Sequence, residues 1–203
     1  MKQKIKIALI GAGNIGGTIA LLAGVKELGD VVLVDVAEGL AKGKALDLSH
    51  AAAALGSSTA YAGSTDYSAI QDADVCIVTA GVARRPGMSR DDLLSTNAEI
   101  MRSVAQGIKH YAPASFVIVV SNPLDIMAAF CQRLSGLPPE KVIGMAGVLD
   151  SARYRSFLAD ECGVSPSSIQ ALVLGGHGDE MLPLRSCTTI NGAPVSLFIA
   201  DAR

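Results

Sequence analysis

Several polar side chains in this chain have the types and spacing that proton transfer and anion binding require. His177 stands among glycines in the segment Val173-Leu-Gly-Gly-His177-Gly-Asp-Glu180. Imidazole exchanges a proton near neutral pH, and glycine neighbours leave the ring uncrowded, so His177 is a candidate proton acceptor. A histidine in a glycine turn is also a common structural feature, and its partners decide between the two interpretations.

Asp150 and Arg153 are the candidate partners. They lie at positions i and i+3 of a predicted helix, and therefore on one helical face. One interpretation is a local ion pair. The other divides the tasks, with Arg153 binding a carboxylate through its planar guanidinium while Asp150 supports the histidine. The sequence leaves both open.

A second group of cations lies on a Pro-Gly loop that follows a predicted strand. The loop reads Gly81-Val-Ala-Arg84-Arg85-Pro-Gly-Met-Ser-Arg90-Asp-Asp. A loop of this kind could close over a bound anion, expel water and bring guanidinium groups to it. The alternative is a solvated basic loop whose arginines pair with the neighbouring aspartates.

The elements that would position these residues begin with a glycine-rich turn. The apolar run Lys4–Ile10 leads into Gly11, Ala12, Gly13, Asn14, Ile15 and Gly16, and a second apolar run, Val31–Val34, ends in Asp35. A strand, this glycine spacing, a helix and a second strand with a terminal acid predict a dinucleotide-binding unit, with the pyrophosphate at the helix N-terminus. The alternatives are a connecting turn and an ordinary aspartate at a strand end.

Asp35 also predicts which dinucleotide binds. Its carboxylate would accept hydrogen bonds from the ribose hydroxyls and would repel a 2′-phosphate. NAD is therefore expected in preference to NADP.

Short apolar runs alternate with longer helical patterns up to about residue 145. Strands are expected at 4–10, 31–34, 59–62, 73–79, 116–120 and 141–144, and helices at 38–53, 90–111 and 124–134. Buried strands alternating with helices are typical of a doubly wound parallel sheet. Residues 1–145 are therefore predicted to form an α/β Rossmann domain.

The pattern changes after residue 145. A helix is expected through Cys162, followed by strands at 169–174, 187–190 and 195–199, and Asn191-Gly192 between the last two is a hairpin signal. Residues 146–203 are expected to begin an α+β domain that ends before its sheet is covered.

Composition narrows the functional classes. The chain has 203 residues, and 50% of them are hydrophobic, which is enough for a substantial core. Its formal net charge is −2, and its lysines and arginines form no basic stripe that would bind nucleic acid. No apolar segment approaches the ~18 residues of a membrane span, and the N-terminus lacks a signal-peptide pattern, so a cytoplasmic protein is expected. Four widely spaced cysteines suggest neither a metal site nor a disulfide framework.

Taken together, the motifs resemble the lactate and malate dehydrogenase family of 2-hydroxyacid dehydrogenases, specifically its lactate-dehydrogenase-like malate enzymes. The matching segments span residues 4 to about 184. They are GAGNIGG at 11–17, Asp35, TAG at 79–81, ARRPGMSRDDLL at 83–94, Asn97, SNPLD at 121–125, LDSARYR at 149–155 and GGHGDEMLPL at 175–184.

The resemblance implies a role for each candidate residue. His177 would accept the proton of the malate hydroxyl, Asp150 would hold the imidazole tautomer, and Arg153 would bind a carboxylate. Arg90 would polarise the reacting carbonyl, and Asn122 would bond near the substrate oxygen. The remaining cofactor contacts implied are Thr79, Ala80, Gly81, Asn97, Val120, Ser121 and Asn122.

Arg84 is the residue expected to select the substrate. The family's lactate enzymes carry a neutral glutamine at the matching position, whereas malate enzymes carry an arginine for the second carboxylate. An unpaired charge on either partner would be unfavourable, so malate and oxaloacetate are expected, with lactate as the alternative.

Family members continue beyond the position of Arg203. The resemblance therefore implies a C-terminally short chain, and a non-catalytic NAD-binding module is the further alternative. It also implies a homo-oligomer, a dimer or tetramer, when full length.

Overall fold

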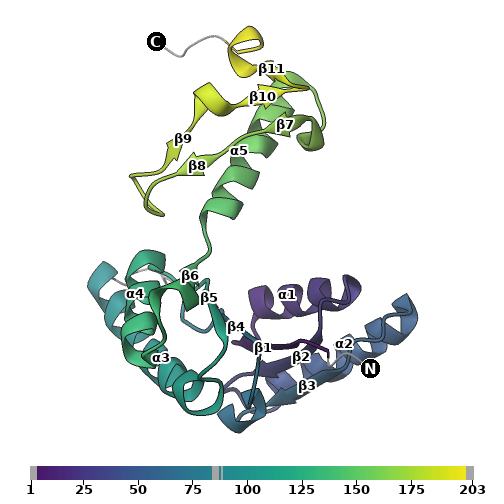
Figure 1. The fold of residues 1–203 in the computed structure, drawn as a ribbon, viewed down its shortest axis with the longest axis vertical. Helices are drawn as coiled ribbons and strands as arrows, with labels where there is room; N and C mark the ends of the chain where they lie inside the picture. Colours follow the sequence, from purple (N-terminus) through teal and green to yellow (C-terminus); the bar gives the residue numbers. More distant parts are fainter. Residues whose placement is uncertain (1–3, 84–86, 88, 200–203) are drawn as a thin grey trace. The chain divides into compact units, whose positions relative to one another are not determined.

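The structure is a computed structural model that describes residues 4–83, 87 and 89–199; of Arg90 only the backbone is described. The chain divides into two compact units, Met1–Gly144 and Met145–Arg203. Figure 1 shows the elements of each unit.

The N-terminal unit is built on one six-stranded parallel sheet. Its strands follow the order β3-β2-β1-β4-β5-β6. They are β1 (Lys6–Ile10), β2 (Asp30–Val34), β3 (Tyr61–Ser64), β4 (Val75–Val78), β5 (Phe116–Val119) and β6 (Val142–Gly144). This order is that of the Rossmann fold, and it reverses between β1 and β4. The predicted doubly wound α/β fold is confirmed.

Four helices among the described residues cover this sheet. They are α1 (Asn14–Val25), α2 (Leu40–Leu55), α3 (Arg90–Tyr111) and α4 (Leu124–Ser135). The first two pack on each other and on β1 to β3, while α4 packs on β5, β6 and α3. Short 3-10 turns, η1 (Tyr67–Ile70) and η2 (Pro139–Lys141), complete the unit. A core of aliphatic side chains from β1, β2, α1 and α2 joins the sheet to its first helix pair.

The carboxyl ends of these parallel strands share one edge of the sheet. The glycine turn follows β1, Asp35 follows β2, Thr79 follows β4 and Ser121 lies two residues beyond β5. Ligands of open α/β sheets bind at this edge, where the strand order reverses. The fold therefore gathers the predicted cofactor contacts at one place.

The C-terminal unit combines one long helix with short antiparallel strands. The helix is α5 (Gly147–Cys162), and the strands are β7 (Ile169–Gln170), β8 (Val173–Leu174), β9 (Leu182–Pro183), β10 (Thr189–Ile190) and β11 (Ala193–Pro194). The strands form a sheet of order β11-β10-β7 and a separate β8-β9 pair. Turns η3 (Pro166–Ser168), η4 (Arg185–Cys187) and η5 (Val195–Leu197) lie between or after them.

The strand boundaries predicted for this unit were wrong in three places. The strand expected at 187–190 is limited to the two residues of β10, because Cys187 ends the turn η4. The single strand expected at 169–174 is two strands in different sheets, because β7 pairs with β10 whereas β8 pairs with β9. The strand expected at 195–199 is largely η5: the Phe198 and Ile199 N–H groups donate to the Val195 carbonyl, which turns the chain out of the ladder. The Asn191-Gly192 hairpin is confirmed, since Ile190 pairs with Ala193 across it.

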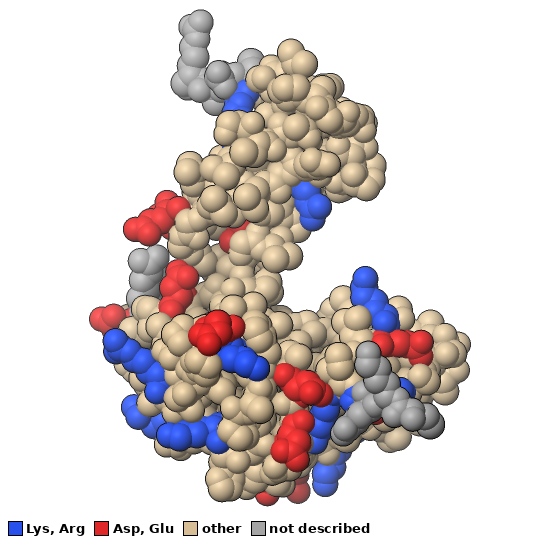
Figure 2. Space-filling model, in the orientation of Figure 1, with Lys and Arg blue, Asp and Glu red and all other residues tan. Residues whose placement is uncertain are grey.

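Charged side chains are mixed in sign over the N-terminal unit on the face that Figure 2 shows. Within residues 4–83, 87 and 89–199, no helix is long and apolar enough to cross a membrane.

Candidate functional site

The glycine turn leaves β1 with a backbone conformation that suits glycine. Gly11 has φ +106°, and its N–H donates to the Val34 carbonyl at 2.8 Å. A side chain is rarely tolerated at this φ. The turn is thereby tied to the end of β2, where Asp35 follows.

Asp35 holds the turn from the other side. Its Oδ2 accepts the Ala12 N–H at 2.7 Å and its Oδ1 accepts the Ala37 N–H at 2.9 Å. A carboxylate has about four acceptor positions, so each oxygen retains capacity for a further donor. Asp35 can therefore fix the glycine turn and still accept hydrogen bonds from ribose hydroxyls.

The other two glycines of the motif have different surroundings. A Cβ on Gly16 would lie 1.9 Å from the Gly11 carbonyl oxygen, whereas a Cβ on Gly13 would meet no atom within 4 Å. Gly16 is required by the close packing of α1 on the turn. Gly13 leaves open space beside the N-terminus of α1, where a pyrophosphate would approach the backbone N–H groups.

Hydroxyl groups join the turn to the ends of β4 and β5. The Thr79 hydroxyl donates to the Gly11 carbonyl at 3.0 Å, and the Ser121 hydroxyl donates to the Ala80 carbonyl at 2.6 Å. Val120 follows β5 directly, and its N–H donates to the Val78 carbonyl. These predicted cofactor residues are thus brought together at the sheet edge.

Asn97 joins two loops through its side-chain amide. Its Oδ1 accepts the Val82 N–H at 2.8 Å, and its Nδ2 donates to the carbonyls of Asn122 at 2.7 Å and Val82 at 3.3 Å. Asn97 is only 3% exposed, and its buried side-chain amide holds together the loops that follow β4 and β5. Its contact with the cofactor stays a prediction.

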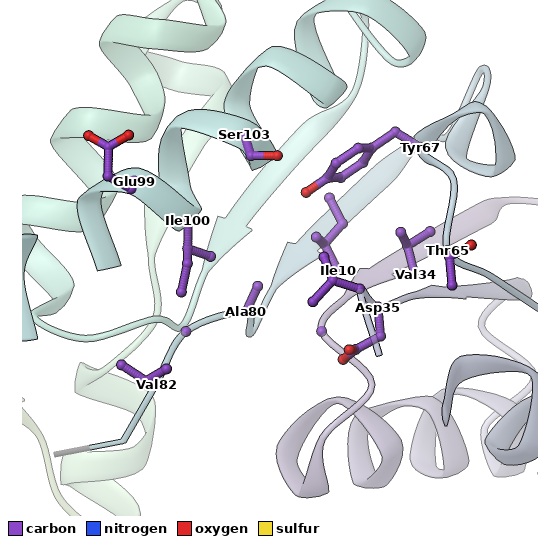
Figure 3. Close-up of a pocket in the computed structure, with 13 residues that line it drawn as sticks. Ile10, Val34, Asp35, Thr65, Tyr67, Ala80, Val82, Glu99, Ile100 and Ser103 are labelled. Carbon is purple, nitrogen blue, oxygen red and sulfur yellow. The ribbon is translucent and has the colours of Figure 1, made fainter. Parts of the chain in front are cut away.

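A cavity of about 490 Å³ lies beside the glycine turn, within the range of small-molecule sites. Figure 3 shows the Tyr67 ring and Ser103 above the Asp35 carboxylate, with Ile10 and Val34 between Tyr67 and Asp35 and with Ile100 and Ala80 to the left. The lining residues are Ile10, Gly11, Val34, Asp35, Val36, Thr65, Tyr67, Ala80, Gly81, Val82, Glu99, Ile100 and Ser103. Together with the turn, this largely apolar slot fits the nucleoside part of a dinucleotide.

Tyr67 and Ser103 were not identified from the sequence. Tyr67 follows the carboxyl end of β3, and this position at the ligand edge of a parallel sheet is the signal that would have indicated it. Burial raises the pKa of the Tyr67 hydroxyl, its hydrogen bond with Ser103 lowers it, and the nearby Asp35 charge raises it. The phenol therefore stays neutral and presents a polar group to the slot.

The C-terminal unit brings the proton-transfer candidates together. His177 Nδ1 lies 2.9 Å from Asp150 Oδ2, and Arg153 Nη1 donates to Asp150 Oδ1 at 3.2 Å. The sequence left open a local ion pair or a support for the histidine. In the structure the one carboxylate makes both contacts.

Burial differs among these three side chains. The Asp150 side chain is 6% exposed, that of His177 23% and that of Arg153 56%. The buried carboxylate is thus charge-compensated by a guanidinium whose outer part reaches solvent. With Nδ1 directed at Asp150, proton exchange with a ligand would take place at Nε2.

The predicted arginine loop is only partly described. Arg84 and Arg85 lie outside the described residues, and Arg90 is the first residue of α3. The Ser89 hydroxyl accepts the Asp92 N–H, and the Asp92 carboxylate accepts the Ser89 N–H, which forms a capping box. Hydrogen bonds from the Ser89 hydroxyl and then its backbone lower the pKa of Asp92. The Asp92 carboxylate thus stabilises the N-terminus of α3 through Ser89.

Two of the four cysteines are buried in the core of the sheet domain. Burial raises the pKa of Cys76, in β4, to about 11 and that of Cys131, in α4, to about 12. A thiol that remains protonated is a poor nucleophile. Within the described residues, no group of three or more His, Cys, Asp or Glu side chains could hold a metal ion.

Thiol labelling of the native protein is therefore expected to separate the cysteines. At about pH 8, 5,5′-dithiobis(2-nitrobenzoate) should react first with Cys187, which is exposed, and more slowly with the half-buried Cys162. Cys76 and Cys131 should react only in urea. Peptide mass mapping with time would identify each labelled residue, and equal rates for all four in the native protein would contradict the assignment.

The fold and site define a dinucleotide-binding protein of the Rossmann class, and comparison with known families gives the particular group. Residues 5–144 match the family described as lactate/malate dehydrogenase, NAD binding domain. Residues 147–201 match the family's alpha/beta C-terminal domain. The chain belongs to the lactate/malate dehydrogenase family, and the predicted cofactor, NAD, agrees with the domain that it matches.

Individual relatives support this membership. The chain is 63% identical to a malate dehydrogenase of Xanthobacter autotrophicus over 94% of this chain and 59% of the relative. It is 57% identical to malate dehydrogenase 1 of Anaeromyxobacter dehalogenans, over 100% of this chain and 66% of that one. The chain thus spans less than two thirds of the length of these relatives.

Solved structures of the same family have the same fold. A malate dehydrogenase of Cryptosporidium parvum is 52% identical with a TM-score of 0.93, over 97% of this chain and 62% of that one. A lactate dehydrogenase of the same organism, complexed with lactic acid and NAD, is 50% identical with a TM-score of 0.92, over 98% and 63%.

Proposed function

We propose that this protein is a NAD-dependent malate dehydrogenase, which interconverts (S)-malate and oxaloacetate. The observation that carries the proposal is the Asp150 carboxylate, which contacts His177 at 2.9 Å and Arg153 at 3.2 Å. A proton-exchanging ring and a carboxylate-binding cation are thereby fixed to one buried group. These are the two functions that oxidation of a hydroxy acid needs from side chains.

The glycine turn, Asp35 and the adjoining cavity are proposed to hold NAD. The open space beside Gly13 admits the pyrophosphate, and Asp35 accepts hydrogen bonds from a ribose while it retains the turn. When bound, NAD would supply the hydride-transfer chemistry at the carbon that bears the malate hydroxyl.

The side chains then perform the remaining steps. His177 accepts the hydroxyl proton at Nε2 as the carbonyl forms, and returns it in the reverse reaction. Asp150 keeps the proton of the neutral ring on Nδ1, so that Nε2 is the basic nitrogen. Arg153 binds the carboxylate next to the reacting carbon with its planar fork.

The N-terminal loops supply the other proposed contacts. Arg84 binds the distal carboxylate, Arg90 polarises the carbonyl, and Asn122 bonds near the substrate oxygen. Residues 1–145 are proposed as the NAD-binding domain and 146–203 as part of the substrate domain. The predicted cytoplasmic location and homo-oligomeric state stay predictions.

Substitution of Arg84 tests which acid is the substrate. Arg84→Gln is expected to lower kcat/KM for oxaloacetate by about 10²–10³-fold, because one carboxylate loses its partner, and to improve use of pyruvate. NADH oxidation with each acid provides the measurement.

The adjacent arginine provides the matched control. Arg85→Gln removes the same charge one residue away and should leave the preference for oxaloacetate nearly unchanged. Preference of the parent chain for pyruvate would instead identify a lactate dehydrogenase. An effect of Arg85→Gln equal to that of Arg84→Gln would contradict the assignment of Arg84.

A further inference from the structure

The contact between His177 and Asp150 depends on how β8 lies on α5. The two residues are 27 positions apart, and only Gly175 and Gly176 separate His177 from the end of β8. A Cβ on Gly175 would lie 2.2 Å from the Glu180 carbonyl oxygen, so the loop closes tightly on itself. A shift of β8 along α5 would therefore carry the imidazole with it.

Pairing with β9 constrains β8 only in part. Each strand has two residues, and Val173 lies opposite Pro183 in a non-hydrogen-bonded antiparallel pair, so the backbone polar groups of Val173 point away from β9. The next backbone bond of this pair is from the Leu184 N–H to the Leu172 carbonyl at 2.8 Å. The Val173 N–H is directed elsewhere.

The acceptor of that N–H is Ser151, the residue that follows Asp150 in α5. The Val173 N–H donates to Ser151 Oγ at 3.0 Å, and the contact is buried. One turn earlier on the same helix face, a Cβ on Gly147 would lie 3.6 Å from the Val173 carbonyl oxygen. Both backbone polar groups of Val173 thus face α5, along which β8 lies in Figure 1.

We propose that Ser151 is a positioning residue for His177: its hydroxyl fixes β8 at one height on α5 and so keeps the imidazole Nδ1 on Asp150. Ser151 is 9% exposed, and its hydroxyl contacts the Val173 N–H inside the unit. Without the hydroxyl, the buried Val173 N–H has no acceptor at this position, which is unfavourable enough to displace the strand. The catalytic consequence rests on the proposed function; the geometric one does not.

The tautomer of His177 reports this geometry directly. While Nδ1 donates to Asp150, the neutral ring carries its proton on Nδ1, and its two ring nitrogens have well-separated ¹⁵N chemical shifts. If the contact is lost, the proton distributes over both nitrogens and the two shifts move toward each other. The chain has three histidines, so the His177 signals can be assigned from the spectrum of a His177→Gln variant.

Two variants of equal shape isolate the hydroxyl. Ser151→Thr keeps an acceptor and adds a methyl group, whereas Ser151→Val adds the same volume without an acceptor. In ¹⁵N-histidine-labelled protein above the range where histidine titrates, the Thr variant is expected to retain the separated His177 signals and the Val variant to lose them. Ser135→Val is the matched control, because Ser135 is also buried but bonds within its own helix end, to the Gln132 carbonyl. It should leave His177 unchanged.

Either of two results would overturn the proposal. One is a Val variant that keeps the parent His177 signals, because the hydroxyl would then be dispensable. The other is loss of the signals in both Thr and Val variants, by local shift or by unfolding, because added volume would then be the cause. The measurement needs no turnover, so an inactive chain would refute the proposed function and leave this test intact.

Discussion

Replacement of Gly16 by alanine is expected to lower the free energy of unfolding by about 3 kcal/mol, since the new methyl group would lie 1.9 Å from the Gly11 carbonyl oxygen. The obstacle is backbone, which cannot rotate aside as a flexible side chain would. For a chain of this size the loss corresponds to a decrease in Tm of roughly 6–12 °C. NAD binding should weaken as well, because α1 can no longer pack on the turn.

Gly13→Ala separates the two effects. No atom lies within 4 Å of the added Cβ, and Gly13 has φ −65°, which alanine adopts without strain. Tm should remain within about 2 °C of the parent value, while NAD affinity falls by about tenfold or more because the methyl group occupies the approach to the pyrophosphate. Thermal unfolding and calorimetric titration with NADH measure both. Unchanged Tm in Gly16→Ala, or parent-like affinity in Gly13→Ala, would contradict the proposed turn.

Asp150→Asn is expected to have the largest effect on catalysis. The side chain keeps its shape, but Arg153 can only donate, so the amide oxygen must face Arg153 and the NH₂ group must face His177. His177 Nδ1 then becomes an acceptor, and its proton moves to Nε2. The ring presents a proton where malate oxidation requires a base.

We expect kcat/KM to fall by about 10²–10⁴-fold. Oxidation and reduction must fall by the same factor, because an enzyme cannot change the equilibrium. The His177 ¹⁵N signals should report the opposite tautomer in this variant. Arg153→Lys is the comparison: it keeps the charge and should raise KM more than it lowers kcat. Activity of Asp150→Asn within tenfold of the parent would contradict the assigned role.

The N-terminal unit could be predicted closely because its strands are buried on both sides. Runs such as Val31–Val34 and Phe116–Val120 are continuously apolar, and glycine turns or polar segments bound them. The helix at 90–111 was predicted with its observed limits. Errors at the other elements are confined to a few terminal residues.

The C-terminal unit was harder because its strands have two residues each. Two residues carry no periodic signal, so Ile169–Leu174 could not be divided between two sheets from the pattern alone. The hairpin was predictable because Asn-Gly determines the turn itself.

In the candidate site too, the residues that belong to a local sequence motif could be predicted and the others could not. The glycine turn and Asp35 form a local sequence motif, and they were found from it. Tyr67 and Ser103 line the cavity from η1 and α3, and Ser151 contacts Val173 across 22 positions. Such contacts arise from packing between distant segments, which a single sequence does not encode as a pattern.

The most direct test of the proposed function is NADH oxidation by the purified chain on addition of oxaloacetate, with His177→Asn measured in parallel at the same protein concentration. We predict turnover by the parent chain and a decrease of at least about 10²-fold in the variant, because the proton donor is removed. Bound NADH that is not oxidised by oxaloacetate, or equal rates for parent and variant, would contradict the proposal that this chain is a malate dehydrogenase acting through His177.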